Sequence, residues 1–291
     1  MTLSAPTKKM KNKKNSEKFS LCILNTRSVR NKTDELNEYV VDNDVDLFIA
    51  TESWIRNEDT VIINKLVPAN FDSLFENRKH SKGGGIAYLF KKSVKVSRAS
   101  TKNVFSTFEI LQLNVLLGKN HVRIVSVYCP PSTSVVDFLT EFAELLSNLN
   151  TGPGHILILG DFNLHDKAND SNFKKFLLLL DAFSLKQDVD VPTHRHNHIL
   201  DLVITREHNS IIQSCDVVDH QISDHYYIFC NLTFPKSEPI KRTISFRKTK
   251  NIPIDKFRCD INSTIATKAD TTNKWMFITT FFPKYWKNMF H

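Results

Sequence analysis

The stretch "HILILGDFNLHD", residues 155–166, runs four apolar residues into a glycine and then presents an acid and an amide. Residues spaced by two on an extended backbone point the same way. The spacing therefore predicts a buried strand whose end brings Asp161 and Asn163 to one spot. Gly, Asp and Asn are also ordinary turn residues, so a surface turn is the alternative explanation for this stretch.

The composition of the chain narrows the class of protein. Its 291 residues, 41% of them hydrophobic, suffice for one large domain or two small ones. With 39 Lys and Arg against 31 Asp and Glu, the formal charge of +8 favours polyanionic partners, nucleic acid before acidic membrane. The five cysteines form no C-x-x-C pair, which argues against a zinc knuckle or a disulfide framework and for a reducing compartment.

The N-terminus lacks an apolar signal core, and no apolar run approaches the roughly 18 residues of a membrane helix. We therefore expect a soluble, intracellular protein without a membrane partner. Residues 1–17 are polar and lysine-rich, which is typical of a disordered basic arm. Residues 235–291 read as a basic linker followed by a short aromatic tail.

Between these segments, residues 18–234 hold eight apolar runs that read as strands and three segments that read as helices. The strand candidates are "FSLCILN", "VDLFIATES", "GGGIAYLF", "FEILQLNVLL", "VRIVSVYCPP", "HILILGDFN", "ILDLVIT" and "YYIFCNLTF". The helix candidates are "KTDELNEYVV", "SNFKKFLLLLDAF" and "VVDFLTEFAELLSNL", the last with Phe138, Phe142, Leu145 and Leu149 on one face. Because strands outnumber helices without a strict βαβ rhythm, an α/β fold with a sheet-on-sheet core flanked by helices is expected.

Polar side chains stand at or near the ends of six of these runs. They are Asn25, Glu52, Tyr128, Asp161 with Asn163, Asp201, and the pair Asp224–His225. Each has a structural explanation, since a single acid after a strand is usually a cap or a turn residue and a tyrosine there is often a core aromatic. Six such endings together are poorly explained by independent turns, and alternate strands can bring them to one rim of a layered sheet.

This set of side chains predicts metal-assisted phosphodiester chemistry. Oxygen ligands without thiolates suit Mg²⁺ or Mn²⁺. An imidazole held by a carboxylate can stabilise charge on a pentacoordinate phosphorus, and an acid beside an amide can position an attacking water. The chain has neither G-x-x-x-x-G-K-[ST] nor G-x-G-x-x-G, so no organic nucleotide cofactor is expected.

Seven segments occur in an order that resembles the endonuclease/exonuclease/phosphatase superfamily. More narrowly, they resemble the apurinic-type endonuclease domain of LINE-class (non-LTR) retrotransposons. They are "LNTRSVRNK", "FIATESW", "SKGGGIAYLF", "VSVYCPPS", "LILGDFN", "PTHRHNHILDLVIT" and "ISDH". The resemblance covers about Phe19 to Phe234, and "RTISFRKTKNIPIDKF" resembles the connector before reverse transcriptase in some of these elements. It implies a DNase I-like four-layer α/β/β/α sandwich and Mg²⁺-dependent nicking of one DNA strand, with the tail a truncated connector to a missing polymerase.

The resemblance also implies residue roles. Glu52 would be the main metal ligand, with Asn25 and Asp224 near it. Asp161 would orient or deprotonate the water, assisted by Asn163. The scissile phosphate would meet His225, which Asp201 would hold, and Tyr128, which would line the site. Thr193 matches a DNA-contacting position at the base of a hairpin.

Arg27 departs from the pattern, because repair-type members carry an acid there and some LINE members an amide. A cation cannot ligate the metal but can hold a phosphate, so we expect Arg27 to bind DNA. In "HRHNH", His194, His196 and His198 recur at period two and would face one side of a hairpin. A metal site is one interpretation; we favour a DNA-probing hairpin, with His194, Arg195 and His196 as its contacts. His165 and Asp166 match no family role. Glu109 lies where the superfamily sometimes uses a glutamate to support the site.

The leading hypothesis is thus a monomeric, nuclear, Mg²⁺-dependent DNA endonuclease that leaves a 3′-hydroxyl. Two alternatives remain: a catalytically silent nucleic-acid-binding remnant, and a phosphatase or phosphodiesterase for inositol lipids or sphingomyelin. Against the first, every matched catalytic position except Arg27 holds a usable residue. Against the second, "PPS" and "PTH" followed by "LDLVIT" resemble the LINE nucleases more closely.

Overall fold

The computed structural model describes residues 17–78, 83–99, 103–150, 154–164 and 171–234, and a few residues between 253 and 262. The chain divides into two units, Met1–Ser237 and Glu238–His291. In the second unit residues 255–256, 258–260 and 262 are helical. The predicted site residues with described structure all lie in the first unit, which is built around two β-sheets.

The first sheet has six strands and contains both ends of the described part of the first unit. In sheet order they are β11 (Ile212–Val218), β12 (Tyr227–Phe234), β1 (Glu17–Asn25), β2 (Leu47–Thr51), β4 (Ile86–Lys91) and β3 (Phe71–Glu76). β1 and β2 are parallel, and the other neighbours are antiparallel.

The second sheet also has six strands. In sheet order they are β5 (Lys95–Arg98), β6 (Glu109–Leu117), β7 (Asn120–Tyr128), β8 (His155–Asp161), β10 (Asp201–Arg206) and β9 (Leu185–Gln187). Here β7 and β8 are the parallel pair. All eight predicted strands are present, with bounds that differ by one or a few residues from the quoted runs.

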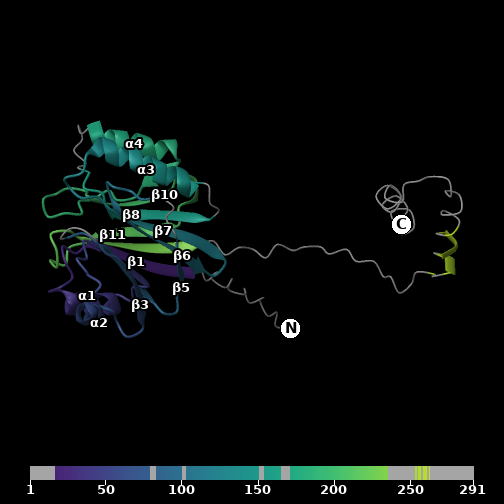
Figure 1. Cartoon of the computed structure of the whole chain (residues 1–291), viewed down its shortest axis with the longest axis horizontal. Helices are drawn as coiled ribbons and strands as arrows, with labels where there is room; N and C mark the ends of the chain where they lie inside the picture. The colour runs from purple at the N-terminus through teal and green to yellow at the C-terminus, as the bar shows by residue number, and fades with distance from the viewer. Residues whose placement is uncertain are drawn as a thin grey trace, which may run out of the picture. The chain divides into compact units, whose positions relative to one another are not determined.

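Helices cover the outer face of each sheet (Figure 1). α1 (Thr33–Asp42) and α2 (Thr60–Leu66) pack on the first sheet, and α3 (Val135–Asn150) and α4 (Ser171–Ala182) pack on the second. A 3₁₀ turn, η1 (Glu207–Asn209), follows β10. The predicted α/β sandwich of two mixed sheets flanked by helices is therefore confirmed.

Three apolar layers hold the sandwich together, and β8 contributes to two of them. Its Leu157 and Leu159 enter the core between the sheets, whereas Ile156 and Ile158 pack under α3 and α4. Alternate strand residues face opposite sides, so a strand covered on both faces needs an unbroken apolar run. Each fully buried side chain of this size contributes about 1.5–3 kcal/mol relative to exposure.

The predicted apolar face of α3 packs into the layer beneath the helices. Phe138, Phe142, Leu145 and Leu149 are all buried. The five described cysteines are free thiols; Cys22, Cys129 and Cys230 are buried and Cys215 is half-buried. Among the described residues, no helix combines the length and the apolarity needed to cross a bilayer.

Strand direction brings the polar strand ends together. The parallel pair β1–β2 places Asn25 beside Thr51, so Glu52 follows at the same edge. The parallel pair β7–β8 places Tyr128 beside Asp161, and the antiparallel β10 begins with Asp201 opposite Asp161.

Candidate active site

The amide of Asn25 joins the two sheets. Its Nδ2 donates to Oε1 of Glu52 at 3.0 Å and to Oδ2 of Asp161 at 2.8 Å. Asn25 ends β1 in the first sheet, and Asp161 ends β8 in the second; both are fully buried. One side chain therefore fixes the separation of two carboxylates that are 109 residues apart in sequence, from position 52 to position 161.

Glu52 stands in a strained turn immediately after β2. Its φ is +48°, and the indole Nε1 of Trp54, whose φ is +54°, donates to its Oε2 at 3.2 Å. Asn163 and Arg27 also have positive φ, of +48° and +43°. Left-handed backbone in residues with a side chain costs free energy and tends to concentrate at functional sites. Here four such residues converge on the strand ends.

Asp161 and Asn163 do meet, although not by strand alternation. The extended segment ends at Asp161, and Asn163 is left-handed. The main-chain N–H of Asn163 donates to Oδ1 of Asp161 at 3.0 Å, and its Nδ2 donates to Oδ2 at 3.1 Å and to the carbonyl of Cys129 at 2.7 Å. The stretch is a strand end followed by an aspartate-stabilised bend, and because Asp161 and Phe162 are fully buried it is not the surface turn of the alternative explanation.

Gly160 allows this strand end to form. A Cβ at that position would lie 1.8 Å from the carbonyl oxygen of Val127 on β7. No side chain can be accommodated so close to a neighbouring backbone. The glycine thus lets β8 approach β7 closely where Asp161 comes beside Tyr128.

Asp201 and His225 form a buried pair next to Asp161. Nδ1 of His225 lies 2.7 Å from Oδ2 of Asp201. Thr193 holds the start of β10 in place, because its buried Oγ1 accepts hydrogen bonds from the main-chain N–H groups of Leu200 and Asp201 at 3.0 and 3.1 Å. Since Nδ1 is engaged by the carboxylate, the imidazole can present only Nε2 to a ligand.

Electrostatics couple these three groups. Burial and the negative charge of Asp201 raise the pKa of Asp161 well above its ordinary value. Burial lowers the pKa of His225, but the charge and hydrogen bond of Asp201 outweigh it and raise this pKa to about 9. The site therefore disfavours the charged form of Asp161, while Asp201 holds His225 as a protonated imidazole at neutral pH.

The donor set can hold a divalent cation. Ligand atoms of Asp161, Asp201 and His225 lie within 4.8 Å of one another, and those of His194, Asp224 and His225 form a second such group. Within the described part of the chain, Oδ1 of Asp201 is buried without a hydrogen-bond partner. Hard carboxylate oxygens and an uncompensated buried acceptor suit Mg²⁺ or Mn²⁺.

Arg27 forms an ion pair with Asp224, a residue that the family pattern predicts near the metal. Burial raises the pKa of Asp224, but the hydrogen bond and charge of Arg27 outweigh it and lower this pKa to about 2. The main-chain N–H of Arg27 donates to Oδ1 of Asn25 at 3.0 Å. The Arg27 side chain is 58% exposed, so its guanidinium stands at the rim of the site.

Tyr128 lies beside Glu52 at the site. It also lies beside Arg78, whose ion pair with Glu109 the sequence did not reveal. Burial and the negative charge and hydrogen bond of Glu52 raise the pKa of Tyr128. The guanidinium of Arg78 lies 5.7 Å from the Tyr128 ring centroid and forms an ion pair with Glu109. Arg78 lies two residues beyond β3 in a polar segment, so no periodicity or motif marked it.

The segment "HRHNH" is a tight turn rather than an extended hairpin strand. Residues 194–198 form a tight turn in which His194 pairs with His198 through the backbone. His194 lies 3.5 Å (Nε2) from Oδ2 of Asp224, and its ring packs edge-on against His225 at 4.7 Å. His196 is exposed, with its ring centroid 5.0 Å from that of His194. The rings of His194 and His196 are therefore brought together by the turn and not by the alternation of an extended strand. His165 and Asp166 lie outside the described residues.

Comparisons with known proteins agree with this architecture. Residues 122–229 match a family described as "Endonuclease-reverse transcriptase". No curated protein matches the chain.

Three solved structures share its fold over 74% of the chain. The endonuclease domain of TRAS1, a telomere-specific non-LTR retrotransposon, has 16% identity and a TM-score of 0.57, with 98% of that chain covered. A 3′ phosphatase from Neisseria bound to a product DNA hairpin has 12% identity, a TM-score of 0.57 and 100% coverage. An endonuclease/exonuclease/phosphatase family protein from Leptotrichia buccalis C-1013-b has 15% identity, a TM-score of 0.56 and 100% coverage.

By its fold, and by the family match of residues 122–229, the chain is similar to the endonuclease/exonuclease/phosphatase superfamily, to which the compared structures belong. The resemblance inferred from the seven sequence segments is confirmed at that level. This superfamily comprises nucleases and phosphatases that hydrolyse phosphate esters and are generally metal-dependent.

Proposed function

We propose that residues 18–234 form a Mg²⁺-dependent DNA endonuclease of retrotransposon type, which nicks one strand and leaves a 3′-hydroxyl. One observation carries the proposal. The Asn25 amide bridges Glu52 and Asp161, and the buried Asp201–His225 pair lies beside Asp161. Acid, amide and imidazole from both sheets thereby surround one point, as hydrolysis of a phosphodiester requires.

DNA as the substrate is supported by charge and by the compared proteins. The formal charge of +8 favours a polyanion. The Neisseria structure contains DNA, and TRAS1 is a retrotransposon. We assign DNA contacts to Arg27, His194, Arg195 and His196, but not to Thr193, which the resemblance placed among them and which is fully buried. The exposed guanidinium of Arg27 and the exposed side chains of Arg195 and His196 support this assignment. The buried hydroxyl of Thr193 acts on the site through Asp201.

Mg²⁺, or Mn²⁺ in its place, would be held by Glu52 with Asn25 and Asp224. When bound, it supplies positive charge against the phosphate oxygens and the developing leaving group. Asn25 must present its amide oxygen for this purpose, whereas here its nitrogen faces the carboxylates and its oxygen accepts from Arg27. Asp224, the third expected metal ligand, is likewise occupied by its ion pair with Arg27. Metal binding at this place would therefore require the Asn25 amide to turn over and the Arg27–Asp224 ion pair to open.

In the proposed reaction, a water attacks phosphorus and the bond from phosphorus to the 3′-oxygen breaks, so that the phosphate stays on the 5′ side and the departing 3′-oxygen takes a proton from solvent. Asp161 accepts the water proton, and Asn163 holds the Asp161 carboxylate in place. A base whose pKa is raised by burial is better suited to this transfer than an ordinary aspartate. The protonated imidazole of His225 stabilises the charge on the phosphate, and the Tyr128 hydroxyl binds a phosphate oxygen.

The remaining parts of the chain complete the proposal. Residues 1–17 would be a basic arm, and residues 235–291 a basic linker and tail. The protein would act as a monomer in the nucleus, where its substrate lies.

The test is nicking of supercoiled plasmid by the full chain with Mg²⁺ or with EDTA, beside His225→Ala. We expect open circular product with Mg²⁺ only, and greatly reduced product from the variant. No Mg²⁺-dependent nicking by the unaltered chain would overturn the proposal. Product that survives His225→Ala would point to a contaminant, and phosphate release from inositol lipids without nicking would favour a lipid phosphatase.

A further inference from the structure

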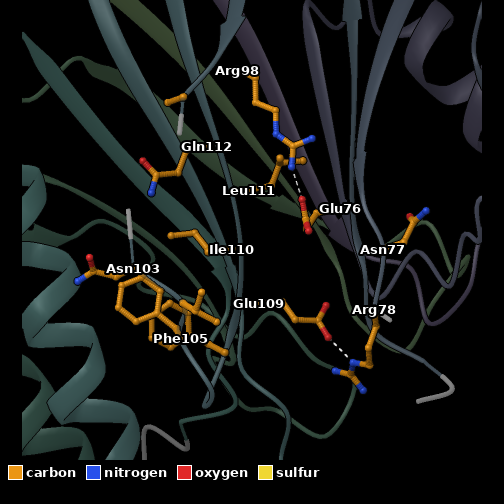
Figure 2. Close-up of a pocket in the computed structure, with 13 residues that line it drawn as sticks. Glu76, Asn77, Arg78, Arg98, Asn103, Phe105, Glu109, Ile110, Leu111 and Gln112 are labelled. Carbon is orange, nitrogen blue, oxygen red and sulfur yellow. Dashed lines mark hydrogen bonds and ion pairs between the residues drawn. The ribbon is translucent and has the colours of Figure 1, made fainter. Parts of the chain in front are cut away.

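A pocket of about 560 Å³ opens next to the proposed catalytic centre and has no part in the reaction described above. It begins at the Arg78–Glu109 ion pair, where Arg78 also faces the Tyr128 ring. From there it follows β6 to Gln112 and the end of β5 (Figure 2). Strand residues rise about 3.4 Å each, so Gln112 lies about 10 Å from Glu109 along the strand. That length equals about three base steps of B-DNA.

An aromatic ring lines one wall of this pocket. Phe105 is half-buried and stacks on Phe108, with ring centroids 4.7 Å apart and an angle of 21°. Phe108 in turn packs edge-on against Phe138 at 5.7 Å, so the pair is anchored on the apolar layer under α3. A ring supported in this way is a fixed platform for a planar ligand.

Gln112 provides a polar group in the same pocket. The residue is only 4% exposed, and it is one of the residues that line the pocket. A side-chain amide offers two N–H donors and one carbonyl acceptor, so it can pair with donors and acceptors on the edge of a planar ligand. In Figure 2 its side chain and Phe105 lie on the opposite side of the view from the Arg78–Glu109 pair.

The main chain of β6 adds a second recognition element. Ala99 donates its N–H to the carbonyl of Gln112 at 3.0 Å, which shows that Gln112 points its main-chain groups toward the β5 side. Main-chain groups on an antiparallel strand alternate sides with a period of two. Ile110 therefore points its N–H and C=O to the same side, beyond the end of β5, and Ile110 lines the pocket.

The charges around the pocket are balanced. Arg78 pairs with Glu109, and Arg98 pairs with Glu76. The pocket thus suits an uncharged, planar group with donors and acceptors on its edge, and the half-exposed Arg98 can meet a flanking phosphate.

From these contacts we infer that the pocket receives a single unpaired nucleobase of the substrate DNA, within about three nucleotides of the cut. This inference rests on the proposed function. Phe105 stacks on the base, and Gln112 with the Ile110 main chain reads its edge. A base can reach the ring only after leaving the duplex stack. The pocket therefore makes the enzyme select sites where one strand is already unpaired or easily distorted.

The test measures binding rather than cleavage. Full-length protein in EDTA is mixed with a short single-stranded oligonucleotide that carries one 2-aminopurine, moved through successive positions. Stacking on an aromatic ring quenches its fluorescence. We expect quenching at one position, and loss of it with roughly tenfold weaker binding in Phe105→Leu, which keeps the contact with Phe108 but lacks an aromatic face. Val61→Ala, an exposed position on α2, should match the unaltered protein.

Gln112→Leu gives an independent result. We expect the quenching to persist in this variant. Oligonucleotides that differ in one base should then compete with equal affinity, whereas their affinities for the unaltered protein should differ. Quenching that is unchanged in Phe105→Leu, or quenching of the free nucleoside but not of the oligonucleotide, would overturn the inference. Because the readout needs no cleavage, it separates failure of the pocket from failure of the nuclease.

Discussion

Asp201 holds His225 through a contact of 2.7 Å between Oδ2 and Nδ1, in a place where the two side chains are 2% and 7% exposed. The pKa of His225 is raised to about 9 by this contact. The stabilisation is fully present below the unfolded pKa of about 6.5 and is lost as the pH rises through about 9.

Asp201→Asn should remove this dependence and impair catalysis. In EDTA we expect the melting temperature of the unaltered protein to fall between pH 6.5 and 9 more steeply than that of the variant. With Mg²⁺, nicking by the variant should drop by roughly 10²–10⁴-fold, because the imidazole is no longer held in its charged form. Parallel melting curves for the two proteins across this range would contradict the coupling.

Asn25→Asp should make stability depend on metal. The substitution is nearly isosteric but adds a third negative charge beside Glu52 and Asp161. We expect a lower melting temperature than the unaltered protein in EDTA, and a larger increase on addition of Mg²⁺, since a bound cation relieves like-charge repulsion. Differential scanning fluorimetry with and without Mg²⁺ measures both quantities. An equal or smaller Mg²⁺-induced increase in the variant would count against a metal at this place.

Thr193→Val should destabilise the protein more than Thr193→Ser. The valine keeps the shape but leaves the buried N–H groups of Leu200 and Asp201 without an acceptor, at a cost of about 1–3 kcal/mol for each group. The serine retains the hydroxyl. Urea unfolding of the two variants gives the difference directly, and equal free energies of unfolding would show that the hydroxyl is not needed to position Asp201.

Arg27→Gln should weaken DNA binding through the phosphate backbone. Its guanidinium is exposed at the rim, so replacing it should reduce the slope of log affinity against log salt concentration by about 1. Lys119→Gln is the control, because Lys119 lies in the β6–β7 turn at the opposite end of β7 from Tyr128. If both variants changed the slope equally, Arg27 would have no special part in binding.

The strand ends of the site were predictable because Asn25, Glu52 and Asp161 follow apolar runs, whereas Asp201 stands at the start of one. Parallel and antiparallel register then brings Asn25, Glu52, Asp161 and Asp201 together. Local signals of this kind survive folding because a strand buried on both faces has few polar residues before its end, and an exception such as Ser126 of β7 is paired with another buried side chain.

Other features depend on contacts that no local pattern encodes. Arg27 and Asp224 are 197 positions apart, and nothing in either segment marks the other as its partner. Asn163 meets Asp161 through a left-handed turn rather than an extended strand. The helix α2 has seven residues of which only Leu66 is buried, and β3, β5, β9 and β11 are short or weakly alternating, so none of these elements was predicted.

The central claim is that this site cuts DNA with metal and leaves a free 3′-hydroxyl. The most direct measurement treats supercoiled plasmid with the unaltered chain or with Glu52→Gln, and then offers the product to a DNA polymerase with labelled nucleotides. We predict Mg²⁺-dependent open circles that incorporate label without prior phosphatase treatment, and a decrease of at least about 100-fold in the variant. Equal nicking by both proteins, or nicks that the polymerase extends only after phosphatase treatment, would contradict the account.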